Sequence, residues 1–118
     1  MTGSERPAII LLAHRTIEPA RLRELLLGIE EQGVPVRLAT SDNLNPLELA
    51  ASAGMTSRVG VGVGVSLDYV VITTDKLPES RPYIVGLLNE SAERDRILGA
   101  NAARLVKRIP LVPIRRTS

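Results

Sequence analysis

Two hydrophobic patterns alternate along the chain and predict its secondary structure. Continuous aliphatic runs that are bounded by turn-forming residues predict buried strands. These runs fall at residues 8–13, 34–39, 57–65, 69–74 and 82–88. Apolar residues at helical spacing, with start and stop signals around them, predict helices. These segments fall at residues 19–32, 46–54 and 90–107.

The order of these elements predicts an α/β domain. A strand–helix–strand–helix–strand series precedes a hairpin and a closing helix, which predicts a mixed sheet with helices on both faces. The turn over 66–68 is too short to join parallel strands, so the strand over 69–74 is expected to run against the one before it. No repeat or linker interrupts the pattern, and residues 1–118 are expected to form one domain.

The helix over 19–32 carries charges that its dipole disfavours. Gly33 is a stop signal, which places Glu30 and Glu31 in the last turn. A carboxylate near the negative end of a helix costs about 0.3–1 kcal/mol. The helix over 90–107 has the favourable arrangement, with acids in its first turns and bases at its end. The first helix therefore departs from a rule that the last one follows.

A helical wheel separates the two acids. The apolar stripe that faces the core comprises Leu22, Leu25, Leu26 and Ile29. Glu31 lies opposite this stripe, whereas Glu30 falls on its flank. Ala20, Glu24 and Leu27 share the outward side with Glu31. An exposed leucine beside an exposed acid at an unfavourable helix end predicts a contact surface formed by these four outward residues.

Composition excludes several classes of function. Apolar residues make up 44% of the 118 residues, with neither Phe nor Trp, so the core is expected to be aliphatic. The scarcity of aromatic side chains argues against a surface that stacks nucleic-acid bases. The absence of cysteine excludes disulfides, thiolate metal sites and cysteine nucleophiles. The net charge of +2 is dispersed, apart from basic pairs at 107–108 and 115–116.

No segment has the character of a signal peptide or a membrane span. The run AIILLA, at residues 8–13, is far too short to cross a bilayer. We therefore expect a cytoplasmic protein with no membrane partner.

Motifs for catalysis are also lacking. Gly60, Gly62 and Gly64 alternate with valines inside a strand, which predicts a flat face for close helix packing rather than a phosphate loop. His14, the single histidine, is expected at the surface or in a loop, without the partners of a catalytic triad. Ser66 lacks the sequence context of an exposed nucleophile. These observations predict a protein that is not an enzyme.

Asn101 is a polar residue on the apolar stripe of the last helix. Its neighbours on that stripe are Ile97, Leu98 and Leu105. A buried amide needs hydrogen-bond partners. We expect it to bind a nearby loop.

Two segments carry a family resemblance. LRELLLGIEEQGVPVR (22–37) and RILGANAARLVKRIPL (96–111) resemble the small subunit of the reactivating factors for coenzyme-B12-dependent diol and glycerol dehydratases. SRVGVGVGVS (57–66) and LP (77–78) fit the same pattern, and the resemblance extends over about residues 8–111. The segment before the first helix, which includes His14, matches the family only loosely.

The resemblance implies a fold and a function. The fold is a three-layer α/β/α domain, similar to anticodon-binding domains, on a five-stranded mixed sheet whose fourth strand is antiparallel. The function is that of a non-catalytic subunit without its own cofactor. It joins a large ATPase-like subunit that binds ATP, as two large and two small chains. The complex transiently exchanges a subunit with an inactivated diol or glycerol dehydratase, so that damaged cobalamin leaves.

The resemblance also implies a role for one residue. In this family the second glutamate of EEQG reaches across the interface and helps the large subunit to hold a divalent metal ion. In this chain that residue is Glu31. A carboxylate oxygen suits Mg²⁺, and the charge of the ion offsets the field at the helix end.

Two alternatives stay open. The medium subunit of the dehydratase itself has a similar fold, but it is longer and holds cobalamin partly through lysine after the glycine-containing strand. The corresponding turn here, residues 65–68, has no lysine. An RNA-binding module is the more distant alternative, given the fold class and the basic C-terminal end.

We further expect flexible tails at 1–7 and 112–118. An association with a bacterial microcompartment is compatible with the resemblance.

Overall fold

A five-stranded mixed sheet forms the centre of the molecule in the computed structural model, which describes residues 6–113. The strands lie in the order β2-β1-β3-β4-β5. Their bounds are β1 Ile9–His14, β2 Val36–Ser41, β3 Val61–Ser66, β4 Tyr69–Thr74 and β5 Ile84–Leu87. β1 pairs in parallel with β2 and β3, whereas β4 runs antiparallel to both β3 and β5. The predicted antiparallel fourth strand is thereby confirmed.

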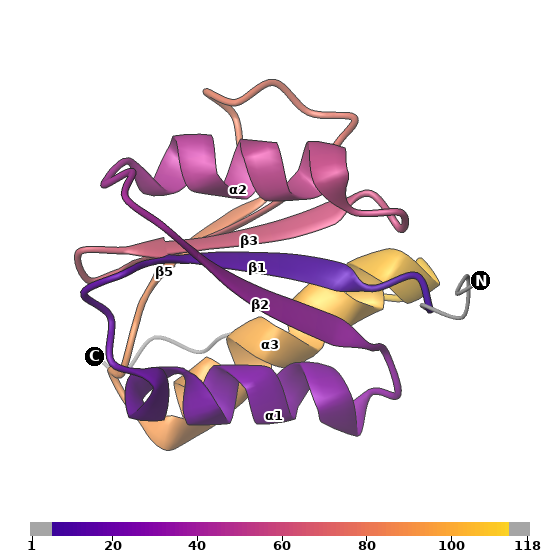
Figure 1. Cartoon of the computed structure of the whole chain (residues 1–118). Helices are drawn as coiled ribbons and strands as arrows, with labels where there is room; N and C mark the ends of the chain where they lie inside the picture. Colours follow the sequence, from indigo (N-terminus) through magenta and orange to yellow (C-terminus); the bar gives the residue numbers. More distant parts are fainter. Residues whose placement is uncertain (1–5, 114–118) are drawn as a thin grey trace.

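Helices cover both faces of this sheet (Figure 1). The helical segments are η1 Pro19–Leu22, α1 Arg23–Glu31, α2 Pro46–Thr56 and α3 Ala92–Lys107. α2 lies on one face, and α1 and α3 lie side by side on the other. The three-layer α/β/α architecture predicted from the sequence and from the resemblance is confirmed.

Some boundaries differ from the predicted ones. β3 begins at Val61 instead of residue 57, because Gly60 adopts a positive φ of 75° that turns the chain into the strand. α3 begins at Ala92, because the Ser91 side chain accepts a hydrogen bond from a backbone N–H of the first turn and acts as the N-cap. Glu90 therefore precedes the helix that was predicted to include it. The predicted first helix divides into the 3₁₀ turn η1 and the α-helix α1.

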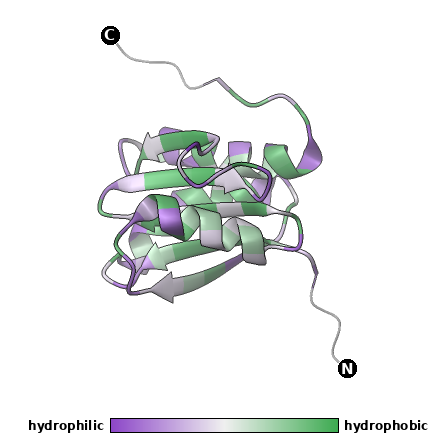
Figure 2. Ribbon diagram, turned by 90° about the horizontal axis from the view of Figure 1, so that it is seen from above, coloured by the Kyte–Doolittle hydropathy of each residue, from purple (hydrophilic) through white to green (hydrophobic). Residues whose placement is uncertain are grey.

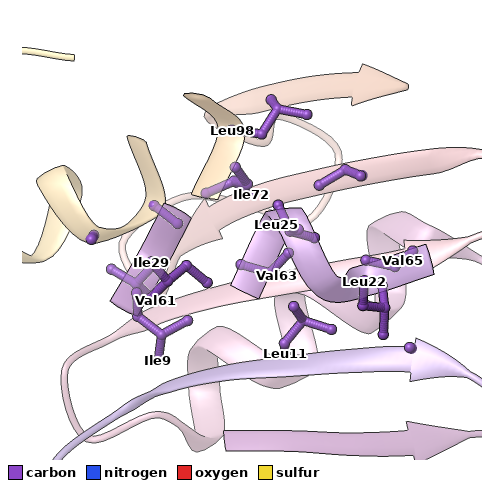
Figure 3. Close-up of a cluster of buried hydrophobic side chains, with 14 of the residues drawn as sticks. Ile9, Leu11, Leu22, Leu25, Ile29, Val61, Val63, Val65, Ile72 and Leu98 are labelled. Atoms are coloured by element: carbon purple, nitrogen blue, oxygen red, sulfur yellow. The ribbon is translucent and has the colours of Figure 1, made fainter. Parts of the chain in front are cut away.

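The larger hydrophobic core lies between the sheet and the α1–α3 layer (Figure 3). α1 contributes Leu25 and Ile29 to this core, and the preceding turn η1 contributes Leu22. All three are at most 1% exposed, as the helical wheel predicts. Leu26 is only partly buried. Hydrophobic residues gather on the strands in the middle of the molecule, and the loops are largely hydrophilic (Figure 2). The core is aliphatic, as the composition predicts.

α2 packs directly on the glycine face of β3. A Cβ atom built on Gly62 would lie 2.1 Å from the backbone N of Gly54 and 2.5 Å from the backbone O of Ala50. A Cβ on Gly64 would lie 2.5 Å from the backbone N of Ala50. Such distances leave no room for a side chain, so the predicted role in close helix packing is confirmed for Gly62 and Gly64. The prediction was wrong for Gly60, which lies in the turn before the strand, where a Cβ atom would meet the Asp75 side chain instead of a helix.

The prediction for His14 was wrong. This residue is the last one of β1, paired with Ser41 of β2, and it is only 6% exposed. Its Nδ1 lies 2.7 Å from Oγ1 of Thr16 and accepts a hydrogen bond from the Thr16 backbone N–H at 3.2 Å. The strand continues one residue further than its aliphatic run, which places the imidazole inside the fold instead of in a loop.

Ser66 and Asn101 are both buried and hydrogen-bonded. The Ser66 hydroxyl donates to the backbone O of Leu44 at 2.7 Å. The Asn101 amide donates to the backbone O of Val112 at 2.9 Å, and its oxygen accepts from the backbone N–H of the same residue at 2.6 Å. The predicted loop partner of Asn101 is therefore confirmed. Most of the predicted tails, residues 1–5 and 114–118, lie outside the described residues.

Replacing Asn101 with leucine is expected to release the segment around Val112 and to lower the free energy of unfolding by about 1–2 kcal/mol. Leucine keeps the branching at Cγ but removes both hydrogen bonds from a largely buried site. Hydrogen exchange of the Val112 amide provides the measurement, with urea unfolding beside it. Unchanged protection of that amide would show that other contacts hold the segment.

Candidate functional site

α1 and α3 cross at two glycines, which allow their backbones to touch. A Cβ atom on Gly28 of α1 would lie 2.2 Å from the backbone O of Arg96. A Cβ on Gly99 of α3 would lie 2.1 Å from the backbone O of Leu25. The sequence interpretation assigned no role to either glycine, although both stand within the two segments that carry the family resemblance. Because the helices are so close, polar side chains beside the crossing on α1 and α3 lie within hydrogen-bond distance of one another.

Arg96 of α3 bridges two glutamates of α1. Its Nε donates to Oε1 of Glu24 at 2.8 Å, and one terminal nitrogen donates to Oε2 of Glu31 at 3.2 Å. The side chains are partly exposed, 43% for Arg96, 28% for Glu24 and 56% for Glu31. An open hollow of about 490 Å³ adjoins this cluster. Its lining comprises Glu24, Glu31, Ala92, Glu93, Arg96, Ile97 and Ala100.

Of the four predicted contact residues, the structure brings Glu24 and Glu31 together in this hollow. Ala20 is exposed on η1, before the helix proper, and does not line it. Leu27 is partly buried, so the prediction of an exposed leucine was wrong. The wheel treated the outward side of α1 as facing solvent, whereas α3 covers part of that side at the glycine crossing.

Two cationic side chains of α3 offset the unfavourable electrostatic field at the C-terminal end of α1. Lys107 donates from Nζ to the backbone O of Gln32 at 2.9 Å, next to the helix C-terminus. Arg96 supplies a second positive charge at Glu31. A base near the C-terminal carbonyls stabilises a helix whichever element provides it. The sequence interpretation missed both partners, because they are distant from α1 in the sequence. Glu30 is exposed on the neighbouring flank.

Within residues 6–113, no cluster of three or more acidic or histidine side chains could hold a metal ion. Glu31 nonetheless suits a shared site. Its carboxylate is a hard oxygen ligand of the type that Mg²⁺ takes, and more than half of the side chain is accessible. The chain can therefore offer one ligand to an ion whose other ligands come from elsewhere. None of the helices in the described part of the chain has the length and apolar character needed to cross a membrane.

Comparisons with known proteins identify the family to which the sequence and fold of this chain correspond. The model of the family described as dehydratase medium subunit matches residues 6–112, almost the whole described chain. The probable small subunit of the glycerol dehydratase-reactivating factor of Citrobacter freundii is 36% identical over 113 residues, which cover 92% of this chain and 96% of the relative. The diol dehydratase-reactivating factor small subunit of Klebsiella michiganensis is 38% identical over 88 residues, or 75% of this chain and 70% of the relative.

Solved structures agree with these relatives. A glycerol dehydratase reactivase chain superposes with a TM-score of 0.87 at 35% identity, covering 92% of this chain and 98% of the other. A chain of the diol dehydratase-reactivating factor complexed with ADP and Mg²⁺ has a TM-score of 0.86 at 33% identity, covering 92% of this chain and all of the other. The chain belongs to the family of small subunits of the glycerol and diol dehydratase-reactivating factors.

Proposed function

We propose that this chain is the non-catalytic small subunit of an ATP-dependent, chaperone-like reactivating factor. It assembles with a large ATPase-like subunit, as two large and two small chains in the cytoplasm. The complex exchanges a subunit with an inactivated diol or glycerol dehydratase, which lets damaged cobalamin leave. The observation that carries this proposal is the match in sequence and fold to reactivating-factor small subunits over 92% of the chain. The match to the family model described as dehydratase medium subunit supports an exchange between the two kinds of subunit.

The α1–α3 face is the surface proposed for the large subunit. It presents an open hollow with partly exposed charges, at the crossing of two helices that glycines allow to pack closely. Ala20, Glu24, Leu27 and Glu31 are the α1-side residues assigned to this contact. Glu31 extends from the last turn of α1, where a cation held by the partner would also offset the helix-end field.

The cofactor assignment belongs to the same proposal. The large subunit binds ATP, and Glu31 contributes one carboxylate to a Mg²⁺ ion held mainly by that subunit. A similar solved complex contains ADP and Mg²⁺, which supports the presence of both species in such an assembly. In this proposal Glu31 binds the ion and orients it at the interface. The ion, when bound, supplies positive charge that links the two subunits electrostatically.

Replacing Glu31 with alanine is expected to weaken binding to the large subunit in the presence of Mg²⁺ by about tenfold, because one ligand of the shared ion is lost. Co-expression, followed by calorimetric measurement of affinity and metal content, provides the test. Glu30→Ala is the matched control, because Glu30 is an exposed acid in the same helical turn. Equal affinity and metal content for both variants would contradict the assignment of Glu31.

The medium subunit of a coenzyme-B12-dependent dehydratase is the second candidate, favoured by the description of the family that matches residues 6–112. A cobalamin-holding lysine would be expected after β3. The turn there comprises Ser66, Leu67 and Asp68, and the Ser66 hydroxyl already donates to a backbone carbonyl. Cobalamin binding by this chain together with a catalytic large dehydratase subunit would favour this candidate over the first.

A further inference from the structure

The two ion pairs of Arg96 are unequal. The contact with Glu24 is shorter, at 2.8 Å against 3.2 Å for Glu31, and Glu24 is the less exposed of the two acids, at 28% against 56%. The Nε atom, which is close to the aliphatic stem, is committed to Glu24, whereas only a terminal nitrogen of the fork reaches Glu31. The guanidinium is thus anchored on one acid and extends to the other.

A guanidinium beside Glu31 has an electrostatic consequence for any cation that approaches the same carboxylate. Two positive charges at one carboxylate repel each other, and this repulsion grows as water is excluded at an interface. Arg96 cannot lose its proton to relieve this repulsion, because its charge is permanent in proteins. A divalent ion at Glu31 therefore competes directly with the existing ion pair.

The hollow beside Arg96 allows the guanidinium to move away from Glu31 without unfolding of the helices. The hollow of about 490 Å³ beside the cluster gives the side chains room to reorient. Glu24 and Glu93 also line it, so each of the two helices presents an acidic residue to the same hollow. Arg96 can release Glu31 and keep its shorter bond to Glu24, which leaves neither the arginine nor Glu24 without a charged partner.

We infer that Arg96 is an internal stand-in for the interfacial cation: it neutralises Glu31 in the free subunit, and Glu24 retains it when Glu31 turns to a divalent ion on the partner. This inference rests on the proposed function. It makes Arg96 and Glu24 positioning residues of opposite effect. Arg96 opposes capture of the ion, and Glu24 favours it by drawing the guanidinium away from Glu31.

The test compares Arg96→Gln with Glu24→Gln in the purified complex of large and small subunits, titrated with Mg²⁺ by calorimetry and with Mn²⁺ by electron paramagnetic resonance. Partly exposed ion pairs of this kind are worth up to about 1 kcal/mol, which corresponds to a change of about two- to fivefold in affinity. Arg96→Gln is expected to tighten binding of the ion by this factor. Glu24→Gln is expected to weaken it by a similar factor, because Arg96 then pairs with Glu31 alone.

A control variant and a stability measurement separate this role from a purely structural one. Arg94→Gln removes another arginine of α3, paired with Glu90 at 3.2 Å and away from the hollow, and should leave ion affinity unchanged. Urea unfolding of each free subunit checks the fold. A purely structural role predicts that Arg96→Gln and Glu24→Gln change ion affinity in the same direction, and that result would overturn the inference. Loss of assembly with Arg96→Gln, or unchanged ion affinity in both variants, would overturn it as well.

The outcome of the Glu31→Ala experiment keeps the two hypotheses apart. If Glu31→Ala does not alter the complex or its metal content, the proposed role of Glu31 fails. If Glu31→Ala weakens ion binding while the opposite effects of Arg96→Gln and Glu24→Gln are not seen, only the stand-in role of Arg96 fails.

Discussion

Replacing Gly99 with alanine is expected to lower the free energy of unfolding by about 3 kcal/mol, because the added methyl group overpacks the crossing of α1 and α3. The new Cβ would lie 2.1 Å from the backbone O of Leu25 and 3.0 Å from the backbone N of Ile29. Neither atom belongs to a flexible side chain, so the helices must separate. Urea unfolding followed by circular dichroism provides the measurement.

The sign of this effect is diagnostic. In an unpacked helix interior, glycine to alanine stabilises by about 1 kcal/mol through helix propensity alone. Ala100→Gly, at the next position of α3, serves as the control and should cost about 1 kcal/mol by the same propensity argument. A Gly99→Ala variant as stable as the parent chain would show that the two helices can move apart freely, and the crossing would no longer account for the position of Arg96.

Gly62→Ala is the second substitution with a large expected effect. It should destabilise the chain by about 3 kcal/mol or prevent its folding, because α2 lies directly on this strand position. The built Cβ meets three backbone atoms of α2 within 2.7 Å, from Ala50, Ala53 and Gly54. Thermal unfolding and the yield of folded protein are the measurements.

Gly54→Ala tests the same contact from the helix side and should have the opposite sign. A Cβ on Gly54 would meet its nearest neighbours at 3.6 Å, an ordinary van der Waals distance. The gain in helix propensity, up to about 1 kcal/mol, then has no clash to oppose it. If Gly62→Ala and Gly54→Ala destabilised the chain equally, the packing of α2 on β3 would differ from the one described.

Local patterns were sufficient to predict most of the fold. The short turn between β3 and β4 dictates an antiparallel pair, and the structure has that pair over six residue partners. Asn45 followed by Pro46 predicts a helix start, and the Asn45 side chain accepts hydrogen bonds from the backbone N–H groups of Leu47 and Glu48. Each of these features depends on residues close together in the chain, where the sequence is most informative.

The candidate site was less predictable, since its geometry depends on contacts between distant segments. A wheel drawn for α1 alone identified Glu24 and Glu31 as neighbours on one side, and the structure agrees. It contained no information about α3, so it could not reveal Arg96, nor the partial burial of Leu27. His14 was misplaced for a related reason: a polar residue extends a strand when its neighbour in the sheet continues alongside it.

The ion-paired face between α1 and α3 unites residues that are 65 and 72 positions apart in the chain. Contacts of such long range carry a large loop-closure entropy cost, which must be paid before they stabilise the chain. A chain in which α3 has not yet packed presents Glu31 without its arginine and lacks the second wall of the hollow. If the large subunit docks on this face as proposed, it would meet the complete surface only after α3 has packed on α1.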